Sequence, residues 1–227
     1  MAKLVFDQDG QRYFEAGVQD VVLFVKDGVS LTHHGYAAGV AWNGCTSISE
    51  SPSGGEANDL WADNMKYASL YSAEVLEGSI EAYTYPDEFC VCDGSAELVT
   101  GVYMGQQSRK PFALAYKTKV GNDEDPDMTN YKLHIVYGLM ATPSEKSYET
   151  INDSPDAITF SWDYTSTPVK TTDALATGKP TSLITIDTTK LTNGVENADL
   201  QELLAALYGT DSAEPYLPYP DEVKGFF

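Results

Sequence analysis

The sequence predicts a mainly β fold with short flanking helices. Residues 158–165 alternate apolar and polar side chains, the pattern of a strand with one buried face, and residues 131–140 repeat that alternation. The apolar run at residues 21–26 is typical of a strand that is buried on both faces. A clear helical spacing of leucines occurs only near the C-terminus. We therefore expect about residues 14–167 to form one mainly antiparallel β domain.

The most informative stretch is residues 59–94. Residues 67–85 are predicted to form two strands that turn back on each other, followed by a short helix at residues 84–92 that Thr84 can cap. In the second strand, successive side chains point to opposite faces, so one face is acidic and the other apolar. The acidic face contains Glu77, Ser79 and Glu81, and the apolar face contains Leu76, Ile80 and Ala82.

A long polar loop, about residues 49–66, is expected before this hairpin, because Pro52, Gly54 and Gly55 interrupt the strand pattern. A loop of this length is usually either functional or disordered. It contains Trp61, a residue type that loops rarely expose without a partner. We therefore expect Trp61 to have a binding partner; the alternative is that it fills the core of its own chain.

The composition divides the chain into a β domain at residues 1–167 and a C-terminal extension at residues 168–227. In the extension, Asn197 can cap a short helix at about residues 198–208, and Gly209 ends it. The proline-rich segment that follows is expected to be an extended arm.

The net charge of −20, with 34 acidic and 14 basic residues, argues against binding to nucleic acid, because phosphate contacts depend on Lys and Arg clusters. High charge also promotes solubility, and a halophilic origin would produce the same composition. The odd set Cys45, Cys90 and Cys92 favours free thiols in a reducing cytoplasm. No apolar run is long enough to span a membrane, and residues 1–10 lack the apolar core of a secretory signal.

Catalytic patterns are missing from the sequence, which predicts no enzyme activity. The three histidines, His33, His34 and His134, have no recognised triad spacing, and no phosphate-binding glycine loop occurs. Glu77 and Glu81 lie roughly 13 Å apart along an extended strand at about 3.3 Å per residue. That separation is too large for proton transfer between them.

One acidic cluster resembles the start of a calcium-binding loop. Asp123, Asp125 and Asp127 have the correct spacing, but Met128 replaces the glycine and His134 replaces the closing glutamate. A solvated hairpin tip is the favoured interpretation. We therefore expect no metal and no cofactor.

Several segments in a fixed order resemble the major tail tube proteins of long-tailed bacteriophages. These are GVAWNGCTSIS, a polar loop, LWADNMKY, and a strand pair ending in GSIEAYTYPDEF; the later segments are KPFALAYKTK, NYKLHIVYGLM and PDAITFSWDYT. The resemblance covers about residues 14–167 and is weaker over residues 168–227. It depends on the order and spacing of the segments.

The resemblance implies a tail-tube fold, a β-sandwich that contributes strands to a ring-shaped inner β-barrel. Hexameric rings would stack into the non-contractile tube through which phage DNA is delivered. Implied partners are other copies of the chain, a tape measure protein in the lumen, and tail terminator and distal tail proteins at the ends. DNA would pass through without specific binding, and no membrane would be involved. The protein would be made in the bacterial cytoplasm and reside in the virion tail.

The resemblance also implies roles for particular residues. The loop that contacts a neighbouring subunit would contain Asp59, Leu60, Trp61, Asp63, Asn64 and Tyr67. The acidic face of Glu77, Ser79 and Glu81 would line the lumen, where it would repel DNA phosphates within a Debye length of about 8 Å. Two alternatives remain open. One is the tube of a contractile tail, and the other is a β-sandwich module that binds a carbohydrate or cell surface.

Overall fold

The computed structural model describes residues 4–28, 33–148, 150–151, 156–172 and 178–227. The strands are β1 (Phe14–Val25), β2 (Val40–Ala41), β3 (Cys45–Ser53), β4 (Ala57–Ala62), β5 (Met65–Tyr71), β6 (Val75–Ala82), β7 (Ala96–Val99), β8 (Val102–Met104), β9 (Phe112–Gly121), β10 (Asn130–Ala141), β11 (Phe160–Ser166) and β12 (Leu183–Asp187). The α-helices are α1 (Ala198–Tyr208) and α2 (Pro220–Phe226), and short 3-10 helices occupy Asp87–Val91, Thr188–Lys190 and Gly194–Glu196.

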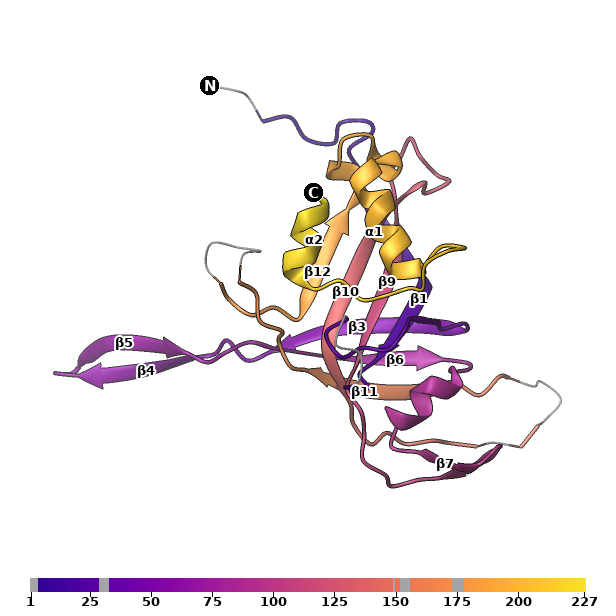
Figure 1. Cartoon of the computed structure of the whole chain (residues 1–227). Helices are drawn as coiled ribbons and strands as arrows, with labels where there is room; N and C mark the ends of the chain where they lie inside the picture. The colour runs from indigo at the N-terminus through magenta and orange to yellow at the C-terminus, as the bar shows by residue number, and fades with distance from the viewer. Residues whose placement is uncertain (1–3, 29–32, 149, 152–155, 173–177) are drawn as a thin grey trace.

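These elements form three layers (Figure 1). Strands β1, β9, β10 and β12 make the middle layer, β3, β6 and β11 lie across one of its faces, and α1 and α2 cover the other. The main sheet has the order β2-β1-β9-β10-β11-β6-β3, with β12 paired to β10, and its pairs are antiparallel. The predicted mainly β, antiparallel class with short helices is confirmed. The sheet does not close into a barrel within one chain.

Strand β10 belongs to both β layers, because its pairing partner changes along its length. Residues 132–136 pair with β12, whereas residues 139–141 pair with β11. Gly138 lies at the change, with a φ of +63°, and its carbonyl accepts a hydrogen bond of 2.8 Å from the Thr167 amide. Glycine adopts this left-handed conformation without the steric cost that a Cβ would add. The irregularity at Gly138 therefore redirects β10 from one layer to the other.

The core between the two β layers is built around aromatic rings. Trp162 of β11 is fully buried, and its ring centroid lies 5.1 Å from Phe89, 5.3 Å from Tyr85 and 5.8 Å from Trp42, in edge-on arrangements. Edge-to-face geometry is favourable because the positive ring edge meets the negative ring face. The free thiol of Cys92 is buried in the same core, and burial raises its pKa to about 12.

A second core lies under the helices. Leu200, Leu203 and Leu207 of α1 are fully buried against the middle layer, and the side chain of Asn197 accepts a hydrogen bond from the Leu200 amide. The prediction of this helix and of its cap is confirmed. The expectation of an extended C-terminal arm is wrong at its end, where α2 forms and buries Val223.

The predicted hairpin at residues 67–85 is wrong, because β5 does not pair with β6. Strand β6 pairs with β3 and β11, whereas β5 pairs with β4. Residues 49–66, predicted as a loop, continue the β3–β6 ladder outward through β4 and β5. The glycines Gly54 and Gly55 interrupt the pairing without reversing the chain, and the reversal comes instead at Asp63 and Asn64.

Two other local predictions also fail. The alternation of residues 36–42 predicts a strand, but the structure has only the two-residue strand β2 there. Gly39 packs closely against β1, where an added Cβ would lie 2.6 Å from the Phe24 ring. The helix expected at residues 84–92 is a 3-10 helix that begins after Pro86, so Thr84 does not cap it. The hairpin of β7 and β8 was not predicted.

Gly138→Ala is expected to lower the free energy of unfolding by about 2 kcal/mol or more, because the left-handed φ penalises a Cβ. That Cβ would also lie 2.2 Å from the Thr167 carbonyl oxygen. Gly105→Ala is the matched control, since its added Cβ meets nothing within 4 Å. Chemical denaturation measures both variants. Equally small effects would show that the change of partner does not require glycine.

Candidate assembly surfaces

The β4–β5 hairpin, called the arm below, projects from the body of the molecule (Figure 1). Its two strands pair only with each other in the described structure. The turn at Asp63 and Asn64 has φ values of 50° and 62°, as two-residue hairpins of the favoured type require. These residues therefore have a structural role, which is to reverse the chain at the tip.

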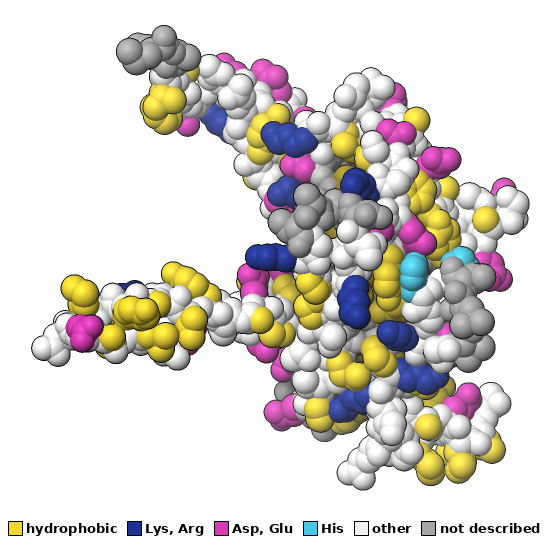
Figure 2. Space-filling model, turned by 60° about the vertical axis from the view of Figure 1, so that its left-hand side comes forward, with side chains coloured by type: hydrophobic (Ala, Val, Ile, Leu, Met, Phe, Trp, Pro, Cys, Tyr) yellow, Lys and Arg dark blue, Asp and Glu magenta, His cyan; other side chains and the backbone are white. Residues whose placement is uncertain are grey.

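The arm exposes large apolar side chains. Trp61 is 69% exposed, Tyr67 76% and Tyr71 73%. Leu60, Met65 and Leu70 are also exposed, and Figure 2 shows hydrophobic side chains along the whole projection. An isolated two-stranded hairpin is marginally stable in water, and a contiguous apolar surface of this kind marks an interaction site. The alternative that Trp61 fills the core of its own chain is wrong.

The charged residues of the arm largely satisfy each other. Asp59 forms an ion pair of 2.7 Å with Lys66 and accepts a hydrogen bond of 2.7 Å from the Ser69 hydroxyl. The hydrogen bond from Lys66 is the main cause that lowers the pKa of the Asp59 carboxyl. Asp59 was predicted as a contact residue, and its observed contacts lie within the arm.

The outward face of β3, β6 and β11 is polar and acidic. Glu77, Ser79 and Glu81 lie together on this face, as the alternation of side chains along the strand predicted. Ile80 and Ala82 are buried on the opposite face. The cross-strand neighbours on the same face are Ser47, Ser49 and Ser51 of β3 and Ser161, Asp163 and Thr165 of β11. We call these nine residues the polar face. It contains three carboxylates and neither Lys nor Arg.

Sequence reasoning missed the β11 contribution to the polar face. The alternation at residues 158–165 did indicate that Asp163 points away from the core, but nothing in the sequence indicated that β11 lies beside β6. The register pairs Asp163 with Ser79 and Ser161 with Glu81. A hydrogen bond of 2.9 Å between the hydroxyls of Ser49 and Ser79 joins β3 to the same surface.

A partly buried polar cluster, also missed, connects β3 to the middle layer. His134 stacks on Tyr116 with a centroid distance of 4.8 Å, and the Tyr116 hydroxyl donates a hydrogen bond to Glu50. The Nδ1 atom of His134 lies 3.5 Å from Oε1 of Glu50, an ion-pair distance without the alignment of a hydrogen bond. The Nε2 atom lies 3.0 Å from the Thr118 hydroxyl. Since Glu50 belongs to β3, the cluster ties the base of the arm to the body.

The cluster places a hydroxyl, an imidazole and a carboxylate in a row, yet it lacks an activated nucleophile. The Thr118 hydroxyl donates its hydrogen bond to Glu15 at 2.5 Å rather than to the imidazole of His134. Glu15 also pairs with Lys132 at 2.5 Å. General-base activation requires the hydroxyl proton to point at the base. The geometry therefore favours a structural role.

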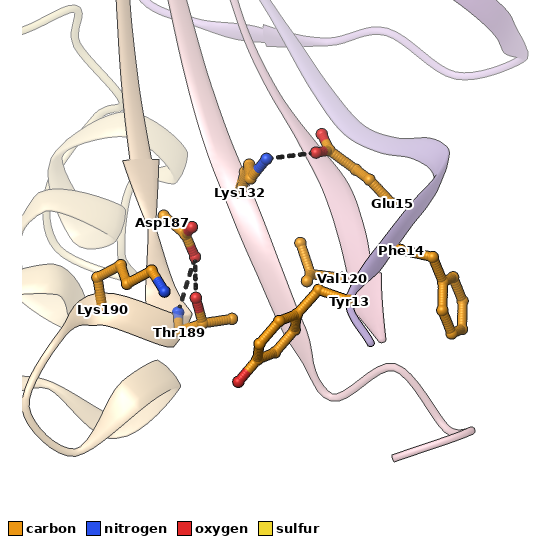
Figure 3. A pocket seen from close by; sticks show the side chains of 8 residues that line it. All are labelled: Tyr13, Phe14, Glu15, Val120, Lys132, Asp187, Thr189 and Lys190. Carbon is orange, nitrogen blue, oxygen red and sulfur yellow. Dashed lines mark hydrogen bonds and ion pairs between the residues drawn. The ribbon is translucent and has the colours of Figure 1, made fainter. Parts of the chain in front are cut away.

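A pocket of about 230 Å³ lies beside this cluster, between the start of β1 and the end of β12 (Figure 3). Glu15 in its wall pairs with Lys132, and the Asp187 carboxylate accepts hydrogen bonds from the amide and hydroxyl of Thr189. The Lys190 ammonium lies 5.7 Å from the ring centroid of Tyr13. The polar groups of the pocket thus bind each other, which leaves little to fix a ligand.

The acidic hairpin tip is occupied by local contacts. Asp123 accepts hydrogen bonds from the Gly10 amide and pairs with Arg12 at 3.4 Å, while Asp125 accepts from the amide and hydroxyl of Thr129. Among the described residues, no group of three His, Cys, Asp or Glu could hold a metal ion.

Comparisons with known proteins identify no relative: no family model matches the chain, and no curated protein matches its sequence. Within the described part of the chain, no helix is long and apolar enough to cross a membrane. The surfaces that a function has to explain are therefore the exposed arm and the polar face.

Glu50→Gln is expected to flatten the pH dependence of stability at acidic pH. The neighbouring His134 is the main cause that holds the pKa of Glu50 below its ordinary value of 4.5. A depressed carboxyl pKa contributes stability above the unfolded value and loses it as the pH falls through the folded value. Wild type should therefore lose stability from about pH 5 downward, and the variant should lose less.

Urea denaturation at pH 7, 5, 4 and 3 measures this difference. Glu56→Gln, on the exposed neck of the arm, controls for the removal of one negative charge. At pH 7 the Glu50 variant should lose about 1–2 kcal/mol, because Tyr116 and His134 lose a charged partner. An unchanged acid slope would contradict the role given to the cluster.

Proposed function

We propose that this chain is the structural subunit of a non-contractile phage tail tube, with the tail-tube fold that its sequence resemblance implies. One observation carries the proposal: the strands β3 and β6 bear the polar face within the body and lead directly into the apolar arm. One end of this ladder suits contact with water and DNA, and the other suits contact with protein. A subunit of a hollow assembly needs both surfaces.

The polar face is proposed to line the lumen. Glu77, Glu81 and Asp163 give it negative charge without a compensating base, and the remaining positions are small hydroxyl residues. Carboxylates on the wall of the lumen would keep DNA from adhering, because proteins bind DNA through Lys and Arg side chains that neutralise its phosphates. The resemblance by itself would assign residues 36–42 and 67–85 to the inner barrel. We propose β3, β6 and β11 instead, because these three strands bear the polar face.

Ring formation would also protect the edge of the sheet. Strand β3 ends the strand order, so its outer backbone groups are unpaired within the described sheet. An exposed edge invites aggregation, and closing strands of several subunits into one barrel removes it. The same proposal includes hexameric rings and a place in the virion tail. Its further partners are a tape measure protein in the lumen and terminator and distal tail proteins at the ends. The proposed role is mechanical, with no catalysis and no cofactor.

A second candidate function is a carbohydrate-binding or adhesion module. Trp61, Tyr67 and Tyr71 on the arm favour it, since exposed aromatic rings can stack on sugars. Such a module would act as a monomer, whereas the tube requires self-association.

Purified wild-type protein is expected to form hollow tubes or rings in negative-stain electron microscopy at high concentration. Trp61→Ala should leave a folded monomer that polymerises poorly, because its indole is 69% exposed in the single chain. Glu202→Ala, an exposed polar position on α1 and outside the arm, is the control and should polymerise. Circular dichroism checks folding. A wild-type monomer that binds a glycan would favour the adhesion module.

Glu77→Lys/Glu81→Lys is expected to make assembled tubes retain DNA. Short duplex DNA added before assembly should become trapped and protected from nuclease, and release should increase steeply with salt. Glu202→Lys/Glu214→Lys places the same charges on the helical side of the molecule, where both residues are exposed. DNA bound by that control should be digested. Digestion of the DNA in both cases would place the polar face outside the tube.

A further inference from the structure

We infer that the arm lies between two different copies of the chain, with each of its faces bound to one of them. The inference rests on the proposed self-assembly and specifies which contacts the arm makes. It follows from the arrangement of side chains on β4 and β5, since apolar residues of two distinct kinds occupy opposite faces.

The register of the hairpin assigns the faces. Residues directly opposite each other share a face, so Asn58 lies with Leu70 and Leu60 with Ala68. At the tip, Ala62 lies with Met65 on this same face. We call it the aliphatic face, and its large apolar residues are Leu60, Met65 and Leu70.

The other face follows from the remaining pairs. Ala57 lies opposite Tyr71, Asp59 opposite Ser69, and Trp61 opposite Lys66. An irregularity between Leu60 and Trp61 leaves Tyr67 as an extra residue on β5, so that Lys66 and Tyr67 share this face. The ion pair of Asp59 with Lys66 and its hydrogen bond with Ser69 agree with this assignment. We call it the aromatic face, and its large residues are Trp61, Tyr67 and Tyr71.

Both faces are open in the single chain. The aliphatic residues are 42–64% exposed and the aromatic ones 69–76%. A hairpin that bound one flat surface would bury one set of side chains and leave the other set in water, which is unfavourable for large apolar groups. Insertion between two surfaces buries both sets. Because the faces differ in shape and chemistry, the two surfaces that receive them differ as well.

The charge distribution favours further copies of this chain as the partners. The arm from Ala57 to Tyr71 contains Asp59, Asp63 and Lys66, a formal charge of −1, while the whole chain carries −20. Two bodies of that charge repel each other, and a nearly neutral apolar hairpin is the part that can lie between them with little repulsion.

The chain also offers an apolar surface that an arm could cover. The hairpin of β7 and β8 lies at the other end of the body from the arm (Figure 1). It exposes Leu98, Val99, Val102, Tyr103 and Met104. Contact between two unlike patches of identical subunits is heterologous, and heterologous contacts generate rings or open stacks. In the proposed assembly, the hairpin of β7 and β8 of a second copy receives one face of the arm, and a third copy receives the other face.

Two triple variants test the inference. Leu60→Ser/Met65→Ser/Leu70→Ser removes the aliphatic face, and Trp61→Ser/Tyr67→Ser/Tyr71→Ser removes the aromatic face. Neither set contacts the core clusters of the body, so both proteins should fold with wild-type stability. Glu202→Ser, an exposed polar change on α1 and outside both faces of the arm, is the control. Light scattering and native mass spectrometry count subunits, and negative-stain microscopy scores tubes.

Wild type and Glu202→Ser should form tubes. We expect the two triple variants to fail at different steps: one remains a monomer, and the other forms closed oligomers that do not stack. Wild-type assembly by either triple variant, or arrest of both at the same species, would overturn the two-sided contact while leaving the proposed tube intact. A wild-type chain that remains a monomer would instead refute the proposed function.

Discussion

The left-handed conformation of Gly138 is the constraint on which the arrangement of the sheet depends. It allows β10 to pair with β12 at one end and with β11 at the other, so one strand serves both β layers. A side chain at this position would meet the Thr167 backbone. The crosswise layer of β3, β6 and β11, and with it the aromatic core around Trp162, follows from that change of partner.

The position of the crosswise layer determines what the molecule presents to its surroundings. One face of β6 and β11 is used for the core, which leaves Glu77, Glu81 and Asp163 on the outside. Beyond the edge of the body, β3 is followed by β4, and β5 leads back into β6, so the arm extends the β3–β6 ladder. The cluster of Glu50, Tyr116 and His134 attaches β3 to the middle layer a few residues before the arm begins.

Charge and apolar surface are separated in this chain. The body carries nearly all of the net charge, whereas many of the exposed large apolar residues lie on the arm and on the hairpin of β7 and β8. A further exposed apolar group, Leu4, Val5 and Phe6, lies near the N-terminus. Acidic bodies repel each other, and apolar projections attract. In the proposed ring assembly, this separation would direct association to contacts through the projections, because the acidic bodies repel each other.

The sequence by itself determined the mainly β class, the strands with clear alternation and the helix capped by Asn197. It also determined that Glu77 and Glu81 lie on the same face of their strand. Those features depend on local periodicity, which the chain records residue by residue. Tertiary structure alone decided which strands pair, because pairing depends on residues far apart in the chain. It turned the expected loop at residues 49–66 into a projecting hairpin, brought Asp163 beside Ser79, and closed the cluster around His134. A two-residue turn at Asp63 and Asn64 reverses the whole ladder, and no local pattern indicated that its strands would extend beyond the body.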